Sequence, residues 1–315
     1  MIFLMSQQAP NSREAAASVY RICGLPVVTS APIEELSAFK ATDLAEKTSL
    51  PAKASAFKGE GKAGPIIYQG PGWFGNQWRT VTCRQIQANY ALQVESVGKF
   101  FLSADGEYLA VIDKAAEVSN RLIREVAMGP ALILALALHD VWCLHASAAR
   151  FEGRSVAFLG ESGRGKSTLA AYLEAEGAAG WQLVADDILP ITQRENQIEA
   201  LPHFPQLKLP QEKQPARALP EHLPLEAVYL LHPAKAVSQP VQLRQPGLSE
   251  AALSLVRHTV ASRLFSKDLL RRHLDFCARA VQVLAVRELE YPQKVEGLPE
   301  IMELINHDLA TLHTQ

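Results

Sequence analysis

The chain has 315 residues, of which 48% are hydrophobic and 20% are charged, and its formal net charge at pH 7 is −2. This length and composition indicate a globular protein with one large core or two ordinary ones. The nearly balanced charge argues against a general nucleic-acid coat and against a polybasic membrane anchor. We therefore predict neither a nucleic-acid partner nor a membrane partner.

The cysteines and the apolar runs indicate the compartment. The four cysteines are Cys23, Cys83, Cys143 and Cys277. They lie far apart without Cys-x-x-Cys spacing, so we expect no zinc site and no disulfide framework. The apolar start at residues 1–5 lacks a basic region and makes a poor secretory signal. The longest apolar run, 131–138, is shorter than the roughly 20 residues of a membrane span. We expect a cytoplasmic protein.

A β-rich region is predicted between residues 65 and 113. Its short segments are rich in aromatic and β-branched residues, which favour strands. They are 66–68, 78–84, 90–94, 99–103 and 108–112. Asp105-Gly106, between the last two, is a typical hairpin dipeptide. We predict a small antiparallel sheet within a β-rich N-terminal domain over residues 1–125, whose first 64 residues show no legible chemistry.

Three aromatic residues, Trp73, Phe74 and Trp78, stand beside glycines in this region. They could form a ligand-stacking surface, but aromatic residues in a β-rich unit more often belong to the core. We expect them in the core.

A helix over 120–140 is predicted to lead into the second half of the chain. Its later part, 131–138, is apolar on all faces and should pack between layers. Strands at 142–149 and 155–159, joined by the turn dipeptide Glu152-Gly153, then form a hairpin. The second of these strands ends at a glycine-rich stretch.

Residues 160–168 have the pattern Gly, four residues, Gly-Lys-Ser of a phosphate-binding loop. In such a loop, backbone N–H groups surround a β-phosphate, the Lys neutralises charge and the Ser hydroxyl reaches Mg²⁺. A helix over 166–176, ended by Gly177, would direct the positive end of its dipole at the anion. The predicted nucleotide-binding residues are Gly160, Glu161, Ser162, Gly163, Arg164, Gly165, Lys166, Ser167 and Thr168.

Two adjacent carboxylates, Asp186 and Asp187, follow a predicted strand at 181–185. A nucleotide-bound Mg²⁺ needs a carboxylate at the end of a neighbouring strand, and phosphoryl transfer to a hydroxyl needs a second carboxylate as proton acceptor. An ordinary Asp-Asp turn is the structural alternative. Because successive strands are commonly neighbours, we expect the pair to face the loop.

The rest of the chain is predicted to complete the core. Prolines exclude long helices from 202–240, where we expect loops, edge strands and one core strand at 227–231. A helical pattern begins at Ser249, and further helices are expected at 267–279 and 299–307, with a strand at 281–286.

Several basic side chains in this part are interpreted as solvated surface charges. Lys208 and Arg217 could instead contact a phosphate or a substrate peptide. A larger basic cluster, expected to form a solvated face, comprises Arg257, His258, Arg263, Lys267, Arg271, Arg272 and His273.

Three segments together resemble the catalytic domain of HPr kinase/phosphorylase and its relatives: 144–148 (Leu-His-Ala-Ser-Ala), 160–168, and 183–187 (Leu-Val-Ala-Asp-Asp). The specific feature is the order of a His-bearing strand, the loop, and an Asp pair nineteen residues after Ser167. The resemblance covers residues 140–305. It implies an α/β fold with the phosphate-loop nucleotide-binding core of the HPr kinase/phosphoenolpyruvate carboxykinase type. This core is a mixed sheet with flanking helices, and the kinase domain would span residues 126–315.

By that resemblance, Asp186 is the general base on an acceptor Ser hydroxyl, and His145 lies beside Asp186 and tunes it. Lys166 bridges the β- and γ-phosphates, while Ser167 and Asp187 hold Mg²⁺. The implied cofactors are ATP and Mg²⁺, and the implied acceptor is a peptide or small protein. A homo-oligomer is compatible with the resemblance. A buried, hydrogen-bonded core histidine is the alternative for His145.

Two departures from the family pattern bear on the substrate. Thr168 stands where members that act on HPr carry an acidic residue, and no Arg-Gly pair occurs downstream of the loop. The segments look more like divergent HPr-kinase-like proteins associated with peptide modification, including kinases that tailor lasso-peptide precursors. We therefore expect ATP-dependent phosphorylation of a serine hydroxyl, without phosphorylase activity.

Two other classes of function also use a phosphate-binding loop. A nucleotide-sensing binding module without kinase turnover would also use the loop. A transport-type ATPase would carry a Leu-Ser-Gly-Gly signature, which this sequence lacks.

Overall fold

The computed structural model describes residues 1–6, 18–41, 64–176, 180–207, 209, 219–234, 240–292 and 294–312. The chain divides into two compact units. Unit 1 comprises Met1–Val141 and Ala261–Arg271, and unit 2 comprises Trp142–Val260 and Arg272–Gln315. The predicted division after residue 125 falls inside unit 1, because the helical segment that follows it packs against strands of that unit.

Unit 1 is built on an eight-stranded sheet with the order β2-β3-β1-β8-β7-β6-β5-β4. The strands are β1 (Ile2–Ser6), β2 (Ser18–Ile22), β3 (Leu25–Thr29), β4 (Ile66–Phe74), β5 (Gln77–Ile86), β6 (Asn89–Val94), β7 (Gly98–Leu102) and β8 (Tyr108–Lys114), with the 3₁₀ helix η1 (Glu34–Phe39). Strands β4 to β8 form the predicted antiparallel arrangement, including the hairpin at Asp105-Gly106. The sheet is larger than predicted because β1 pairs in parallel with both β3 and β8.

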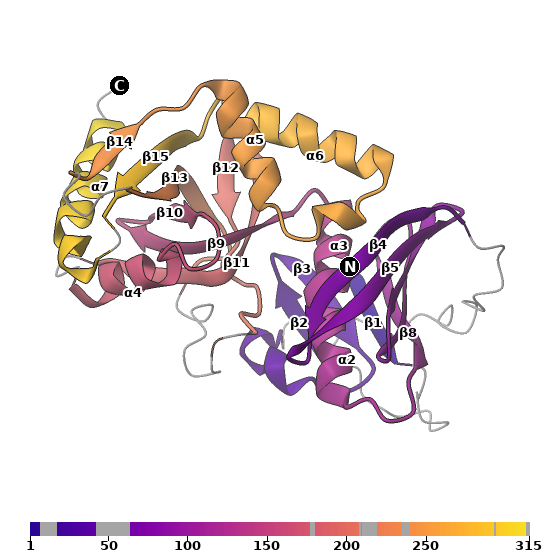
Figure 1. The fold of residues 1–315 in the computed structure, drawn as a ribbon. Helices are drawn as coiled ribbons and strands as arrows, with labels where there is room; N and C mark the ends of the chain where they lie inside the picture. Colours follow the sequence, from indigo (N-terminus) through magenta and orange to yellow (C-terminus); the bar gives the residue numbers. More distant parts are fainter. Residues whose placement is uncertain are drawn as a thin grey trace. The chain divides into compact units, whose positions relative to one another are not determined.

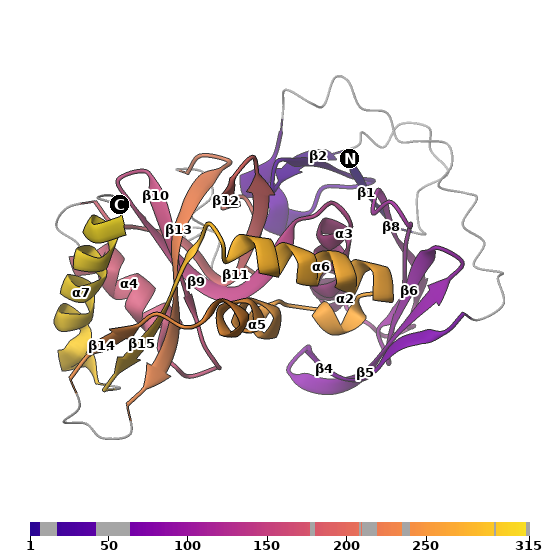
Figure 2. The same cartoon turned by 90° about the horizontal axis from the view of Figure 1, so that it is seen from above.

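The helix predicted over 120–140 is interrupted at Gly129 and Pro130. It consists of α2 (Asn120–Val126), the π-helical turn η3 (Ala127–Ala131) and α3 (Leu132–Leu138). Pro130 has no N–H group with which to continue the α-helical pattern. Residues 132–137 are buried, as predicted for a helix that is apolar on all faces. Figure 2 shows the curved sheet of unit 1 around α2 and α3.

The prediction that Trp73 and Trp78 lie in the core is wrong. Their side chains are 54% and 68% exposed. They face each other across the β4–β5 hairpin, and their rings pack edge to face with centroids 5.3 Å apart. Since β4 is the last strand of the sheet order, these rings cover each other at a sheet edge. Phe74 is half-buried.

Unit 2 contains a seven-stranded mixed sheet. Its strands are β9 (Trp142–Phe151), β10 (Arg154–Leu159), β11 (Gln182–Arg194), β12 (Gln197–Ala200), β13 (Leu223–Pro233), β14 (Gln242–Arg244) and β15 (Ala285–Tyr291). Strands β10, β13 and β15 pair in parallel, while the other pairs are antiparallel. The pairings β10–β9–β11–β12–β13 close into a ring because β13 also pairs with β10. This confirms a mixed α/β architecture.

The helices of unit 2 accompany this sheet. They are α4 (Lys166–Glu176), α5 (Leu248–His258), α6 (Lys267–Ala280), the 3₁₀ helix η7 (Val295–Gly297) and α7 (Leu298–Leu312). The 3₁₀ helix η6 (Ser262–Leu264) and the first residues of α6 belong to unit 1. Both views show α4 and α7 side by side (Figures 1 and 2). Among the helices that the structure describes, none combines the length and the apolar composition of a membrane span.

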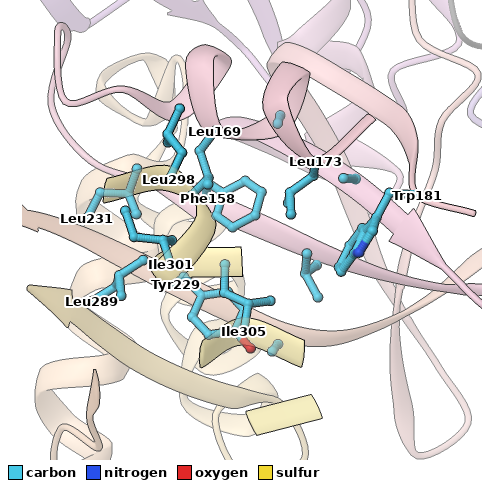
Figure 3. Packing of buried hydrophobic residues seen from close by; sticks show 14 of the residues in the cluster. Phe158, Leu169, Leu173, Trp181, Tyr229, Leu231, Leu289, Leu298, Ile301 and Ile305 are labelled. Atoms are coloured by element: carbon cyan, nitrogen blue, oxygen red, sulfur yellow. The ribbon is translucent and has the colours of Figure 1, made fainter. Parts of the chain in front are cut away.

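A hydrophobic core fixes the two ends of the glycine-rich loop. Phe158 of β10, Leu169 and Leu173 of α4, Tyr229 of β13 and Ile305 of α7 pack together in it (Figure 3). Each is at most 3% exposed, and burying such a side chain contributes about 1.5–3 kcal/mol. Because Phe158 precedes the loop and Leu169 follows it, the core holds the strand and helix that position the loop.

Two strand predictions in unit 2 differ from the structure. The apolar run 281–284 forms turns directly after α6, in which the N–H groups of Val281 and Leu284 donate to Cys277 O and Ala280 O. The strand predicted at 281–286 accordingly begins only at Ala285. The strand predicted at 181–185 continues to Arg194, because β11 pairs with β9 as far as Ile191 and with β12 from Ile191 to Arg194. The two adjacent carboxylates therefore lie inside a strand and not at its end.

Candidate functional site

The loop between β10 and α4 has a backbone that only glycine adopts readily. Gly163 has a φ of 81° and Gly165 a φ of 82°, which are left-handed values unfavourable for residues with a Cβ. The N–H of Leu169 donates to Gly165 O at 2.9 Å, so helical hydrogen bonding begins directly after the loop. The first N–H groups of a helix have no partner within it, and its dipole favours an anion there. The loop and α4 thus form an anion-binding geometry.

Lys166 folds back over this loop. Its Nζ donates to Gly160 O at 2.8 Å and to Glu161 O at 3.2 Å. The residue is only 7% exposed, so its positive charge is held close to the loop in a partly desolvated position, where an anion would interact with it more strongly than in water.

A cavity of about 430 Å³ lies beside the loop. Three groups of residues line it: loop and α4 residues, residues of β9 and β11, and residues at the end of β15 and the start of α7. These are Ser162, Gly163, Gly165, Lys166, Ser167, Thr168 and Leu169; His145, Ser147, Asp186 and Asp187; and Tyr291, Lys294, Val295, Leu298 and Ile301. The two predicted carboxylates and six of the nine predicted loop residues therefore share one cavity.

The remaining loop residues have other contacts. Glu161 and Arg164 form an ion pair with each other, with Arg164 Nη2 2.9 Å from Glu161 Oε2. Arg164 O accepts a hydrogen bond from the Tyr291 hydroxyl, which ties the loop to the end of β15. Burial raises the pKa of Tyr291, so this hydroxyl keeps its proton at neutral pH. Gly160, Glu161 and Arg164 therefore shape the loop and do not line the cavity.

Asp186 is connected to the loop through Ser147. The two residues face each other in the β9–β11 pairing, and Ser147 Oγ donates to Asp186 Oδ1 at 2.8 Å. Ser147 Oγ is also 3.5 Å from Ser167 Oγ in the first turn of α4. Ser147 is only 1% exposed. Its hydroxyl thus connects the Asp186 carboxylate to the Ser167 hydroxyl, which is predicted to reach Mg²⁺.

His145 contacts Asp187, whereas the family resemblance placed it beside Asp186. His145 Nδ1 is 3.1 Å from Asp187 O and 3.3 Å from Asp187 Oδ1. The reason is the register, since His145 faces Ile188 across the β9–β11 pair. Asp187 has a φ of 126°, a value that costs a non-glycine residue about 1–3 kcal/mol and is found mainly at functional sites. This backbone explains how two consecutive strand residues both line the cavity.

His258 is a neighbour of the site that sequence analysis placed on a solvated face. Thr259 forms an antiparallel bridge with Leu144, and Val260 N–H donates to Cys143 O at 2.8 Å. His258 directly precedes this bridge and is the last residue of α5. Burial, and secondarily the positive charge of Lys166, lower the pKa of His258 to about 4. The imidazole of His258 is therefore uncharged at neutral pH.

The rest of the predicted basic cluster divides in two. Arg257, Arg263, Lys267, Arg271 and Arg272 are exposed, as expected. His273 is fully buried and contacts Thr259 Oγ1 through Nε2 at 2.9 Å, so the expectation of a solvated face is wrong for this residue. Lys208, Arg217 and Gly177 lie outside the described residues.

A signal for Ser147 was present in the sequence. Ser147 is two positions after His145 on a predicted strand, and residues i and i+2 of a strand share a face. Tyr291 and His258 carried no such signal, because both come from segments at least 90 residues downstream of the loop.

No protein-family model matches this chain, and no curated protein matches it. Among solved structures, the chain is similar to the Hpr(Ser) kinase/phosphatase from Coxiella burnetii, with 16% sequence identity and a TM-score of 0.30. The match covers 54% of this chain and 92% of that chain. A similarity at this level assigns neither a family nor a function.

Proposed function

We propose that this protein transfers the γ-phosphoryl group of ATP, with Mg²⁺, to a serine hydroxyl of a peptide or small protein. The observation that carries the proposal is the meeting of Lys166, Ser167 and two carboxylates at one cavity, with Ser147 joining the loop hydroxyl to Asp186. The peptide acceptor follows from the resemblance of residues 144–148, 160–168 and 183–187 to peptide-modifying kinases.

The loop supplies the triphosphate site in this proposal. Backbone N–H groups around Gly163 and Gly165, the N-terminus of α4 and the Lys166 ammonium all favour negative charge at the same place. The cavity volume of about 430 Å³ is within the usual range for small-molecule sites.

The residues present also fit Mg²⁺. Within the described part of the chain, no group of three or more His, Cys, Asp and Glu side chains could hold a metal ion. Mg²⁺, however, is usually bound through one or two carboxylates together with substrate phosphates and water. The Ser167 hydroxyl and the carboxylate of Asp186 supply such a donor set beside the loop. When bound there, Mg²⁺ would neutralise charge that develops on the transferring phosphoryl group.

The contacts favour different roles for the two carboxylates. These roles are the reverse of those implied by the resemblance, in which Asp186 is the general base and Asp187 holds Mg²⁺. Asp186 is linked through Ser147 to Ser167, so we assign it to the metal side. Asp187 accepts from His145 Nδ1 on the other side of the pair, so we assign it the role of general base. His145 is then a positioning residue that holds the Asp187 carboxylate.

The proposed reaction uses these groups in one step. Asp187 takes the proton of the acceptor hydroxyl, the hydroxyl oxygen bonds to the γ-phosphorus, and the bond between that phosphorus and the β–γ bridging oxygen breaks to release ADP. Lys166 and the loop N–H groups stabilise charge on the phosphates. Proton removal by a positioned base typically contributes about 10²–10⁴-fold in rate.

The test is phosphoryl transfer by the purified protein. ATP labelled in the γ-phosphate is incubated with Mg²⁺ and a panel of serine-containing peptides, and acid-stable label on peptide is measured. We expect label transfer that chelation of Mg²⁺ abolishes, and that Lys166→Met loses together with nucleotide affinity. The exposed-residue variant Arg263→Gln serves as the control and should retain transfer.

Binding of ATP and Mg²⁺ without transfer to any acceptor would contradict the proposal and support a nucleotide-sensing module. Failure to bind nucleotide at all would contradict both functions.

A further inference from the structure

A buried glutamine outside every sequence motif contacts the strand that carries the two carboxylates. Gln206 follows β12 in the chain and is 1% exposed. Its Oε1 accepts from the N–H groups of Asp186 at 3.2 Å and Ile188 at 3.4 Å. Its Nε2 donates to Ile188 O at 2.7 Å and is 3.4 Å from Phe204 O. The amide therefore bonds the backbone on both sides of Asp187.

The position of these bonds on the sheet explains why they are needed. Along one side, β11 pairs with β9, in which Asp186 faces Ser147 and Ile188 faces His145. Along its other side, β11 pairs with β12 only from Ile191 onward. Backbone groups of a strand alternate between its two edges, so those of Asp186 and Ile188 point to the edge that β12 does not reach. Gln206 takes the place of a neighbouring strand there.

The strained residue lies between these two bonded residues. Asp187 has a φ of 126°, and such a backbone persists only where the surroundings hold it. On the β9 side, His145 Nδ1 contacts Asp187 O and its carboxylate. On the opposite side, Gln206 fixes the preceding N–H and both following backbone groups. The segment that carries both carboxylates is thus held from two sides.

We propose that Gln206 is a positioning residue of the phosphoryl-transfer site, which sets the directions of Asp186 and Asp187 by completing the edge of β11. This inference rests on the proposed function for its catalytic meaning. Removing a group that orients metal ligands typically lowers metal affinity or activity by about 10- to 100-fold. Replacing Gln206 should therefore change the Mg²⁺ requirement more than the affinity of the loop for nucleotide.

The principal variant is Gln206→Met, which keeps the length of the side chain and removes all four hydrogen bonds. A second variant, Gln206→Glu, keeps the acceptor for Asp186 and Ile188 and loses the donor to Ile188 O. The matched control is Gln193→Met, since Gln193 lies on the same strand and its amide accepts from Arg279 Nε instead. Three quantities are compared: amide hydrogen exchange without nucleotide, ATP affinity with and without Mg²⁺, and kcat.

For Gln206→Met we expect amide exchange at Asp186 and Ile188 to be at least about tenfold faster, with exchange in α4 unchanged. We expect ATP affinity without Mg²⁺ to stay within about twofold, while the Mg²⁺ requirement rises and kcat falls by about tenfold or more. Gln206→Glu should show the same direction with a smaller exchange effect. Gln193→Met should match the parent protein in all three.

The proposal is overturned if exchange at Asp186 and Ile188 does not change, or if it accelerates while Mg²⁺ dependence and kcat stay at parental values. It is also overturned if affinity without Mg²⁺ and exchange in α4 change in proportion, since Gln206 would then be a general structural residue. Should Gln206→Met fail to fold, the same outcomes are judged on Gln206→Glu.

Failure of the proposed function can be told apart from failure of this inference. Amide exchange and Mg²⁺-dependent ATP binding need no turnover. A parent protein that transfers no phosphoryl group would contradict the function, whereas unchanged exchange and binding in the Gln206 variants would contradict the role of Gln206.

Discussion

The hydroxyl of Ser147 donates to the carboxylate of Asp186 at 2.8 Å, and these two residues also face each other in the β9–β11 pairing. The same hydroxyl is 3.5 Å from that of Ser167. Side chains from a central strand, its neighbour and the helix after the loop are thereby joined. Through Ser147, the Asp186 carboxylate lies within two hydrogen-bond lengths of the Ser167 hydroxyl. A hydrated Mg²⁺ ion can bridge this distance.

Replacing Ser147 by Ala should impair phosphoryl transfer. Asp186 loses a hydrogen bond that orients it, so we expect kcat to fall about tenfold and the Mg²⁺ requirement to rise. The matched control is Ser155→Ala, because Ser155 is also fully buried but donates to Pro224 O. Both variants should lose about 1 kcal/mol of stability. Steady-state kinetics measure kcat and the Mg²⁺ requirement, and urea unfolding measures the loss of stability. Equal activities in the two variants would contradict the role of Ser147.

Gly163→Ala should lower ATP affinity through backbone strain alone. A Cβ at Gly163 would meet no atom within 4 Å, but its φ of 81° is unfavourable for Ala. The cost of about 1–2 kcal/mol corresponds to a loss of about 5- to 30-fold in affinity if the loop distorts to relieve it. Gly153 has the same φ and the same open space, but lies in the β9–β10 turn. Calorimetric titration with ATP should therefore show parental affinity for Gly153→Ala, and an equal loss in both variants would refute the prediction.

The sequence predicts the parts of this site that depend on neighbouring residues better than the parts that depend on contacts between distant segments. The loop is legible because its glycines, Lys166 and Ser167 are consecutive, and the flanking strand and helix have local patterns. Asp186 and Asp187 were predicted to face the loop from the order of the strands alone, and the cavity brings them there. The contact of His145 with Asp187 was not predicted, because it depends on a one-residue register that only the pairing of two strands sets.

Residues from distant segments could not be predicted. Gln206 acts through its amide on backbone groups of β11 and belongs to no motif. The parallel pairing of β1 with β8 joins residues about 100 positions apart, and no periodicity reports such a contact. Tryptophan is a residue type typical of a core, yet the hairpin that contains Trp73 and Trp78 lies at the edge of its sheet, where both side chains are exposed.

The stability of the protein should fall between pH 7 and pH 5 in part because of His273. Burial lowers the pKa of His273 to about 4, whereas an unfolded histidine titrates near 6.5. Between these values the unfolded chain binds a proton that the folded chain does not. The contribution is therefore fully present above pH 6.5 and is lost as the pH falls towards 4, by about 2 kcal/mol between pH 7 and pH 5.

This pH dependence can be measured by urea unfolding at both pH values. His273→Gln places an uncharged amide in contact with Thr259, so the difference in unfolding free energy between pH 7 and pH 5 should shrink by about 2 kcal/mol. An unchanged difference would show that His273 does not titrate abnormally in the folded protein.

Replacing each of the two carboxylates by the corresponding amide should change the Mg²⁺ dependence of activity differently. Asp186→Asn removes the charge on the metal side, so we expect the Mg²⁺ concentration for half-maximal activity to rise by about tenfold or more. Asp187→Asn leaves that side intact. A Mg²⁺ titration of activity distinguishes them, and the opposite pattern would restore the assignment implied by the family resemblance.

The central claim is that Mg²⁺ and ATP bind beside Asp187, which removes the proton of the acceptor serine. Its most direct test is transfer of label from the γ-phosphate to a serine peptide by the parent protein and by Asp187→Asn, with ATP affinity measured for both in the presence of Mg²⁺. We predict parental affinity within about twofold and a loss of transfer of about 10²-fold or more in Asp187→Asn. Transfer by Asp187→Asn at the parental rate would contradict the claim.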